Sequence, residues 1–192
     1  MKIIGLTYCD GEERLVLKSD SSLLVNRKPL FVPDTITELR GLPCLVLRVS
    51  RLGRCIATKF VQRYYDAIAP GVDFYGADLL REAKQAGSPW TEAVAFENSL
   101  AVGEWQAPGS LQTAEQGHWS VQRDGQRIEW MSLSPEQWQQ QMDKAVARVS
   151  ELLTIRQGDL IYVTAQQSEQ LQAEDILWCE INDKEQLYCK IK

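Results

Sequence analysis

The run LVLRVSRLGR occupies residues 45–54, and its first half is apolar except for Arg48. Pro43 stands before it and Gly53 lies near its end, so turn-forming residues bound the apolar segment on both sides. A short apolar run bounded in this way is typical of a buried strand. We therefore predict a central strand over residues 45–49, and the rest of the fold is built outward from it.

Segments of the same kind lie near both ends of the chain, each bounded by Gly, Asp or Asn residues. They predict strands at residues 2–7 and 14–17 around a turn at 9–11, a strand at 160–163, and a closing hairpin formed by 176–181 and 186–191 around 182–184. The sequence is therefore rich in strands at its two ends.

Two short helices are predicted between these strands. Residues 59–67 place apolar side chains on one helical face. Residues 79–86 predict a second helix, with Asp78 interpreted as its cap and Gly87 as its stop. Residues 106–117 predict a loop.

The sequence Asp124-Gly125 is a strong hairpin signal between the aromatic residues at 119 and 130. The register set by this turn pairs Arg123 with Gln126, Val121 with Ile128 and Trp119 with Trp130. We interpret the tryptophan pair as a cross-strand contact that stabilises the sheet.

Ser134-Pro135-Glu136-Gln137 predicts the start of a long helix. Ser134 and Gln137 have the spacing of a capping box, and Pro135 suits the first helical position. One face of the following segment, which extends to residue 153, is apolar through Trp138, Met142, Ala145, Val149 and Leu152. Strands, then helices, then strands predict an α+β fold that is mostly β.

Composition and charge limit the possible functions. The chain has 192 residues, which suits a single domain, and a net charge of −5 that argues against a nucleic-acid-binding protein. No apolar run approaches the roughly 18 residues of a membrane-spanning helix. The first residues do not resemble a signal peptide, so we expect a cytoplasmic protein without a membrane partner.

Cysteine and histidine usage limits the chemistry. The number of cysteines is odd and no Cys-x-x-Cys motif occurs, so we expect reduced thiols. His118 is the only histidine, which excludes any site that needs two imidazoles, and we expect it in a surface loop.

Several segments, taken in order, resemble the fumarylacetoacetate hydrolase family in its short bacterial form. The residues that carry the resemblance are LKSDSSLL (17–24), KPLFVP (28–33), LVLRVSRLGR (45–54), KFVQRYYD (59–66), GVDF (71–74), GSPW (87–90) and GDLIY (158–162). They span nearly the whole chain.

The resemblance implies a mixed β-roll or β-sandwich that forms dimers. Residues 1–40 would supply N-terminal strands and an extended segment, and residues 41–192 the core β-roll of one domain. The resemblance also implies a divalent cation, typically magnesium, held by three carboxylates. The implied substrates are 2-oxo acids or acylpyruvates, and the reactions are hydrolysis, decarboxylation or isomerisation.

The implied active site is degenerate in this sequence. Leu42 and Cys44 occupy the two positions of the family's Glu-x-Glu metal ligands, and only Asp73 matches a ligand. Val94 stands at the position of a family lysine. One carboxylate is too few for magnesium, so we expect no bound cofactor.

Neighbouring motifs are also changed. The family's Ala-Arg-Asp-Leu becomes residues 76–79 (GADL), and its Thr-Gly-Thr-Pro becomes residues 163–166 (VTAQ). A segment bearing a catalytic His and Glu is replaced by the turn at 9–13, whose Glu13 we interpret as a solvated charge.

These changes leave three hypotheses open. The chain is a non-catalytic homologue that binds a ligand or a partner, such as a catalytically competent paralogue. It is alternatively a divergent metal-dependent hydrolase, decarboxylase or isomerase of 2-oxo acids, with magnesium or another divalent cation. In the third hypothesis, the cleft is filled and the protein serves only in assembly. We expect a homodimer in each case.

Overall fold

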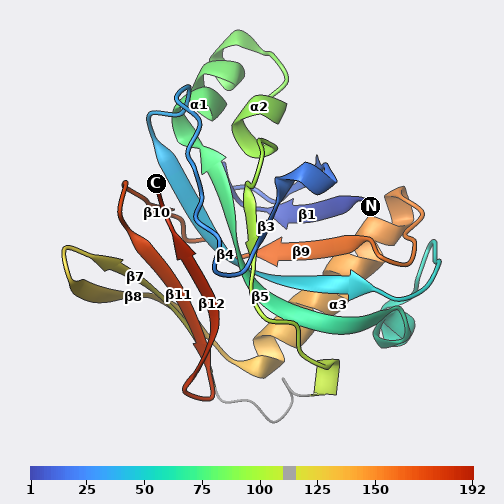
Figure 1. Ribbon diagram of the computed structural model, residues 1–192. Helices are drawn as coiled ribbons and strands as arrows, with labels where there is room; N and C mark the ends of the chain where they lie inside the picture. Colours follow the sequence, from blue (N-terminus) through green and yellow to red (C-terminus); the bar gives the residue numbers. More distant parts are fainter. Residues whose placement is uncertain (110–115) are drawn as a thin grey trace.

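The computed structural model describes residues 1–109 and 116–192, and two sheets and three α-helices make up this part of the chain (Figure 1). Half of the loop predicted at 106–117, residues 110–115, lies outside the described residues, and a strand begins at Gly117. No helix in the described residues is both long and apolar enough to cross a membrane.

The larger sheet is mixed and has the order β2-β1-β9-β4-β5-β6-β3, with β10 paired to β4. β1 runs parallel to β9 and β3 parallel to β6, and the other pairs are antiparallel. The strand bounds are β1 Ile3–Thr7, β2 Arg14–Lys18, β3 Leu23–Val25, β4 Leu39–Val49, β5 Tyr65–Gly76, β6 Leu100–Val102, β9 Leu160–Thr164 and β10 Glu169–Gln170.

The smaller sheet is antiparallel and has the order β12-β11-β7-β8. Its strands are β7 Gly117–Arg123, β8 Gln126–Leu133, β11 Ile176–Ile181 and β12 Lys184–Lys190. The helical segments are η1 Asp20–Ser22, η2 Thr58–Arg63, α1 Ala77–Ala86, α2 Thr91–Val94 and α3 Pro135–Leu152. The mostly-β α+β class is therefore confirmed.

The predicted central strand is part of β4, which crosses the middle of the larger sheet between β9 and β5. Leu45 and Leu47 point to the face covered by α3, where they join the main core with Met142 and Val149. Figure 1 shows α3 lying across this face of the sheet, with α1 and α2 together at one end. The other face of β4 carries the candidate site.

The capping box that starts α3 is present. The Ser134 hydroxyl accepts a hydrogen bond from the Gln137 amide N–H, and the Gln137 side chain accepts one from the Ser134 N–H. The predicted apolar face is buried from Trp138 to Val149, but Leu152 is exposed because it lies in the last turn, beyond the edge of the core.

The helix predicted at residues 59–67 is wrong beyond its first turn. A short 3₁₀ helix, η2, ends at Arg63, and the chain then enters β5 at Tyr65. The Tyr65 side chain is buried, and Ala67 pairs with Arg48 of β4. Pairing with the central strand has overridden the local helical pattern, because it buries a continuous strand on both faces.

The hairpin at Asp124-Gly125 is confirmed, but its aromatic pair is not. Arg123 pairs with Gln126 and Val121 with Ile128, and an irregularity between Trp119 and Ser120 then pairs Trp119 with Met131. The Trp119 ring instead contacts Trp138 of α3, with the ring centroids 5.2 Å apart. A bulge changes which residues lie opposite each other, and no signal in the sequence located it.

Two further predictions need correction. Asp78 is not the cap of its helix, since Gly76 caps α1 and Asp78 lies in the first turn. Its carboxylate instead accepts hydrogen bonds from the amide and hydroxyl of Thr37. His118 lies on β7 and not in a loop, although its side chain is exposed and bonded to Glu129.

Candidate functional site

Strands β4 and β5 bring three of the predicted site positions to one face of the larger sheet. Leu42 lies directly opposite Asp73, and Cys44 lies opposite Gly71. Residues two apart on a strand share a face, so Leu42 and Cys44 face the same side as Asp73. All three are buried, and Asp73 is 3% exposed.

Apolar side chains surround this centre on two sides. Leu42 and Val94 belong to one buried cluster, together with Leu80 and Tyr75. Cys44 belongs to a neighbouring cluster that includes Tyr162. Leu42 and Cys44 therefore lie beside the buried Asp73 carboxylate, and Val94 belongs to the cluster of Leu42.

Side chains of this chain contact both oxygen atoms of the Asp73 carboxylate, although Oδ1 accepts no hydrogen bond from the described residues. Its Oδ1 lies 2.6 Å from the ammonium nitrogen of Lys18, and its Oδ2 accepts a hydrogen bond of 2.9 Å from the Thr7 hydroxyl. Lys18 also donates to the backbone carbonyl and the hydroxyl of Ser99, both at 2.9 Å. The Lys18 side chain is 0% exposed. A buried charge needs such partners, because burial of an isolated ammonium is very costly.

Tyr162 covers the same centre from β9. Burial, followed by the charge of Asp73, raises the pKa of its phenol well above the usual value. The Tyr162 ring lies across Gly5 of β1, where an added Cβ atom would come within 2.1 Å of the ring. Gly5 is thus required for the close approach that brings the Tyr162 hydroxyl toward Asp73.

The residues at this centre do not fit a magnesium or manganese ion. Such ions take several oxygen ligands, with more than one commonly supplied by carboxylates. Leu42 and Val94 offer no ligand atom, and burial, followed by the charge of Asp73, raises the pKa of the Cys44 thiol well above its usual value. No group of three His, Cys, Asp or Glu side chains in the described residues has the arrangement of a metal site.

A shallow cleft lies over the apolar side of the centre. It has a volume of about 400 Å³, and Cys9, Tyr75 and Leu80 of its lining belong to the cluster of Leu42 and Val94. Burial, followed by the charges of Asp73 and Asp10, raises the pKa of Cys9 to about 12. A nucleophilic thiol requires a depressed pKa, so Cys9 and Cys44 are unsuited to that role.

The charged groups around this cleft are already paired with one another. Asp10 accepts from Lys84 at 3.0 Å, and Glu38 bridges Arg40 and Arg81, each at 3.0 Å. The cleft therefore offers few free charges to a ligand.

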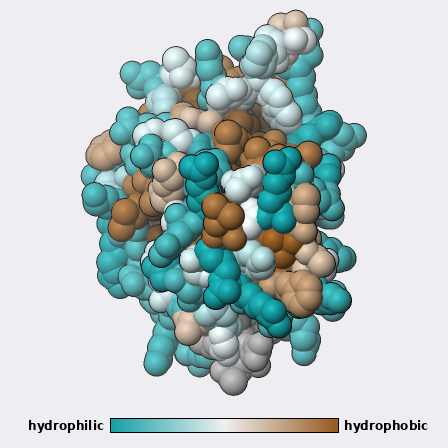
Figure 2. Space-filling view, turned by 90° about the vertical axis from the view of Figure 1, so that its right-hand side faces the viewer, coloured by the Kyte–Doolittle hydropathy of each residue, from teal (hydrophilic) through white to brown (hydrophobic). Residues whose placement is uncertain are grey.

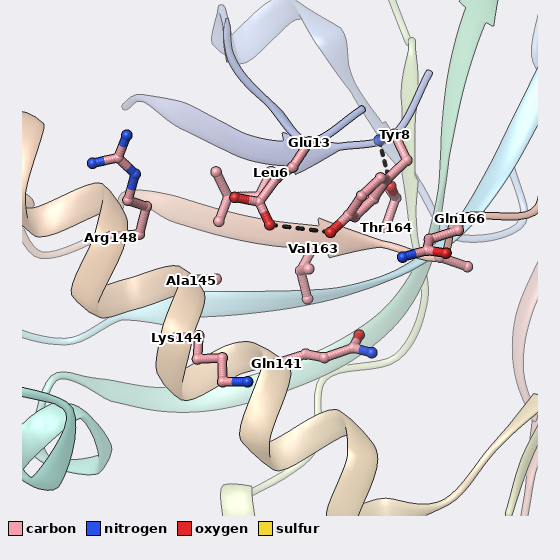
Figure 3. A pocket seen from close by; sticks show the side chains of 11 residues that line it. Leu6, Tyr8, Glu13, Gln141, Lys144, Ala145, Arg148, Val163, Thr164 and Gln166 are labelled. Carbon is pink, nitrogen blue, oxygen red and sulfur yellow. Dashed lines mark hydrogen bonds between the residues drawn. The ribbon is translucent and has the colours of Figure 1, made fainter. Parts of the chain in front are cut away.

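A second pocket lies between α3 and the adjoining ends of β1 and β9 (Figure 3). Its volume is about 400 Å³, and Leu6, Ala145 and Val163 form its apolar part. Figure 3 shows Lys144 and Arg148 projecting from α3 on one side. Residues Val163 to Gln166 form part of the lining, and this is the segment that replaces the family's Thr-Gly-Thr-Pro.

Glu13 also lines this pocket, and it is exposed as predicted but has a hydrogen-bond partner. It accepts a hydrogen bond of 3.1 Å from the Tyr8 hydroxyl, and the Tyr8 amide donates to Thr164 at 3.1 Å. Burial, followed by the Glu13 charge, raises the pKa of Tyr8, so the phenol stays protonated as a donor. Arg148 is paired with Glu151 at 3.1 Å, whereas Lys144 makes no ion pair within the described part of the chain.

Sequence reasoning missed Lys18, Thr7, Ser99 and Tyr162. The signal for Lys18 was its spacing from Val16, since alternate residues of β2 face inward. The chain offers a misleading alternative, because Leu15 and Leu17 of the same strand are more apolar, yet they are 37% and 52% exposed. An inward-facing lysine on an edge strand also opposes edge-to-edge association.

The chain has the architecture of a β-roll protein, in which a mixed sheet curls around α3. Its buried acidic centre lies between β4 and β5. Sequence comparison identifies the family. The model for the C-terminal domain of fumarylacetoacetate hydrolase matches residues 9–191. The chain belongs to the fumarylacetoacetate hydrolase family. No curated protein matches its sequence significantly.

Solved structures share the fold at low sequence identity. Fumarylpyruvate hydrolase from Pseudomonas aeruginosa, solved with Mn²⁺ and pyruvate, is 17% identical with a TM-score of 0.83, covering 100% of this chain and 89% of its own. A family protein from Yersinia pestis is 21% identical with a TM-score of 0.82, covering 100% and 91%. The 5-carboxymethyl-2-hydroxymuconate delta-isomerase from Mycobacterium smegmatis is 14% identical with a TM-score of 0.77, covering 99% and 76%.

Proposed function

We propose that this protein has lost the metal-dependent catalysis of its family and serves as a binding protein. The observation that carries the proposal is the Lys18 ammonium, which lies 2.6 Å from Asp73 in a buried, mostly apolar environment. The ammonium supplies the positive charge that this carboxylate needs. A divalent cation at the same carboxylate would have to displace Lys18 or be buried beside a second cationic group.

The remaining groups support the same conclusion. A 2-oxo acid that reacts through an enolate needs a positive charge beside its developing oxyanion. The Lys18 ammonium already donates to both oxygen atoms of Ser99 and forms an ion pair with Asp73, so its charge is held within the chain. Leu42 and Val94 add no polar group. The centre is suited to holding the sheet together and unsuited to polarising a substrate.

The experiment is a metal titration combined with an activity assay. Isothermal titration calorimetry with Mg²⁺ and Mn²⁺ is expected to show no binding at Asp73, and oxaloacetate or acylpyruvate turnover is expected to stay at background with either ion. Micromolar binding that Asp73→Ala abolishes would overturn the proposal. Metal-stimulated turnover would do the same and would favour the alternative of a divergent hydrolase, decarboxylase or isomerase.

The pocket beside α3 is the favoured place for a ligand. Its α3 side presents Lys144, which makes no ion pair in the described residues, and Arg148, which is paired with Glu151. The opposite side presents the carboxamide of Gln166 and a single acid, Glu13 (Figure 3). A concave site with an apolar part and a few polar groups is typical of small-molecule binding. We propose that it binds a small organic anion, such as a 2-oxo acid.

The ligand proposal is tested with defined probes. Thermal-shift and calorimetric titrations would use 2-oxoglutarate, pyruvate and succinate, with Lys144→Gln/Arg148→Gln as the pocket variant and the exposed Lys184→Gln as the control. Binding that is lost only in the pocket variant is expected. Equal binding by all three proteins, or binding by none, would contradict the ligand proposal and leave the loss of catalysis standing.

The oligomeric state and the cellular location of the protein are also proposals. We propose a homodimer, with pairing to a catalytically competent paralogue as the alternative, and light scattering at micromolar concentration tests it. A mass of one chain would contradict the homodimer. We also propose a cytoplasmic location, supported by five free cysteines, four of which are buried. Free thiols persist in reducing compartments.

A further inference from the structure

A strongly basic segment lies on the surface of this acidic protein. Residues 48–65 contain five cations, Arg48, Arg51, Arg54, Lys59 and Arg63, and no Asp or Glu, although the whole chain carries a net charge of −5. Arg48 lies at the end of β4, and the other four cations lie in the loop after β4 and the short helix η2. Such separation of charge on one surface favours a partner of opposite sign.

Most of these cations have no acidic partner. Arg48 pairs with Asp66 at 2.8 Å and lies over the Trp105 ring. The other four are exposed and make no ion pair in the described residues. Arg51, Leu52, Arg54, Lys59, Phe60 and Arg63 are called the basic patch below.

The basic patch also exposes apolar side chains. Leu52 is 69% exposed and Phe60 is 40% exposed. The ammonium of Lys59 and the guanidinium of Arg63 lie 5.0 and 4.9 Å from the centre of the Phe60 ring. Exposed aromatic and arginine side chains in one place are typical of the centres of protein interfaces.

The backbone under the basic patch is held in place before any partner binds. Gly53 and Ile155 exchange two hydrogen bonds of 3.0 Å, and the Cys55 amide donates to the Ser150 carbonyl at 2.8 Å. The Ser50 amide donates to the Tyr64 carbonyl at 2.8 Å, which joins the loop to the end of η2. A preorganised loop loses less conformational entropy when it binds.

The two parts of the basic patch lie on one face. In Figure 1 the loop after β4 and η2 are adjacent at the right-hand side of the molecule. Figure 2 views this side directly and shows small apolar areas set among hydrophilic side chains. The patch is therefore an open surface and not the wall of either pocket.

We infer that the basic patch docks an acidic segment of another protein that carries an apolar side chain. Charge complementarity selects the acidic residues, and Leu52 and Phe60 select the apolar one. A second copy cannot pair patch to patch, because an isologous contact would bring like charges together. Two partly exposed apolar side chains are too few to anchor the protein in a bilayer. The inference goes beyond the proposed function and uses none of its residues.

The test uses a fluorescent peptide with alternating Glu and Leu residues, and two control peptides in which Gln replaces Glu or Ser replaces Leu. Fluorescence anisotropy in physiological salt is expected to show binding of the first peptide only. The triple variant Arg51→Gln/Arg54→Gln/Arg63→Gln is expected to weaken binding at least about tenfold, and Phe60→Ser by about tenfold.

The matched control is Lys28→Gln/Lys184→Gln/Lys192→Gln, which removes the same charge from exposed positions outside the basic patch. This control variant is expected to bind the peptide of Glu and Leu as tightly as the unmodified protein does. Equal weakening by both triple variants would show non-specific attraction and overturn the inference. Tighter binding to a single-stranded oligonucleotide or to phosphatidylglycerol vesicles than to the peptide would also overturn it, as would no peptide binding.

A fluorophore on Cys55 gives a second readout. Cys55 is the only exposed cysteine of the five and lies inside the loop that carries the basic patch. An environment-sensitive dye at this position is expected to respond to the acidic peptide and not to its Gln counterpart. The same response to both peptides would contradict docking by charge.

Discussion

The buried pair of Lys18 and Asp73 joins the edge strand β2 to β5, the neighbour of the central strand β4, through side chains alone. Removing one member of a buried ion pair leaves the other charge without a partner, which costs about 3–5 kcal/mol of unfolding free energy. Replacing both members by apolar residues removes that penalty. Comparing single and double variants therefore separates the energy of the ion pair from that of the packing around it.

We predict that Lys18→Met and Asp73→Leu each lower the free energy of unfolding by about 3–5 kcal/mol in urea denaturation. The double variant Lys18→Met/Asp73→Leu is expected to lose less than either single variant. The exposed pair of Arg48 and Asp66 is the control, where single changes should cost about 1 kcal/mol or less. Strictly additive losses at Lys18 and Asp73 would contradict the account of the buried pair.

A second prediction concerns Gly5. Its replacement by Ala is expected to destabilise the protein by about 1–3 kcal/mol, since the added carbon would overlap the Tyr162 ring. Gly109→Ala is a suitable control because nothing lies within 4 Å of its added carbon. Thermal unfolding of the two variants measures the difference. An unchanged melting temperature for Gly5→Ala would show that Tyr162 is free to move.

At the residue scale, the sequence predicted four positions of the candidate site, including the buried carboxylate, but not the lysine that pairs with it. Leu42 and Cys44 could be placed because the ungapped run at 45–54 fixes their register, and Asp73 and Val94 because they lie in or near two other segments that resemble the family, at 71–74 and 87–90. Lys18 could not, since its partner is 55 positions away and its strand offers Leu15 and Leu17 as better core candidates. Pairings between distant segments are set by the sheet order, which local patterns do not encode.

At the scale of elements, the start of α3 depends on its capping box. We predict that Ser134→Ala lowers the free energy of unfolding by about 1 kcal/mol, because it removes the acceptor for the Gln137 amide. Ser134→Asn is expected to retain most of the stability, because Asn is also a strong cap. Chemical denaturation measures both variants. A loss in Ser134→Asn equal to that of Ser134→Ala would contradict a capping role.

Turns and helix starts that depend on a few adjacent residues were predicted correctly. Features that depend on packing against distant segments were not. The Asp124-Gly125 turn and the Ser134 cap each determine structure within a few residues. The bulge beside Trp119 and the early start of β5 at Tyr65 instead depend on packing against α3 and β4. Tertiary contacts decide such positions, so a single sequence gives no warning of them.

For the whole molecule, buried thiols make stability depend on alkaline pH. Burial, the first cause in each case, raises the pKa of Cys9 and Cys189 to about 12 and that of Cys44 and Cys179 well above the usual value. Unfolded thiols lose their protons from about pH 8.5, whereas the folded ones keep them. The unfolded state is therefore favoured as the pH rises.

We predict that the free energy of unfolding is steady between pH 7 and 8 and then falls, with each thiol contributing up to about 1.4 kcal/mol per pH unit. Urea denaturation at several pH values measures the slope. Cys9→Ala/Cys189→Ala is expected to flatten it. Iodoacetamide at pH 8 should modify only Cys55 in the folded protein, as read by mass spectrometry, and rapid modification of the buried thiols would contradict this account.

The Lys18 ammonium beside Asp73 is covalently part of the chain, so we expect the stability of the protein to be independent of the metal ions in its surroundings. A chelator cannot extract an ammonium group, and dilution cannot release it. We expect the same melting temperature in EDTA and in millimolar magnesium, and a shift of several degrees between the two would contradict this. In a cell starved of divalent ions, the fold would persist unchanged, as would any binding surface that it carries.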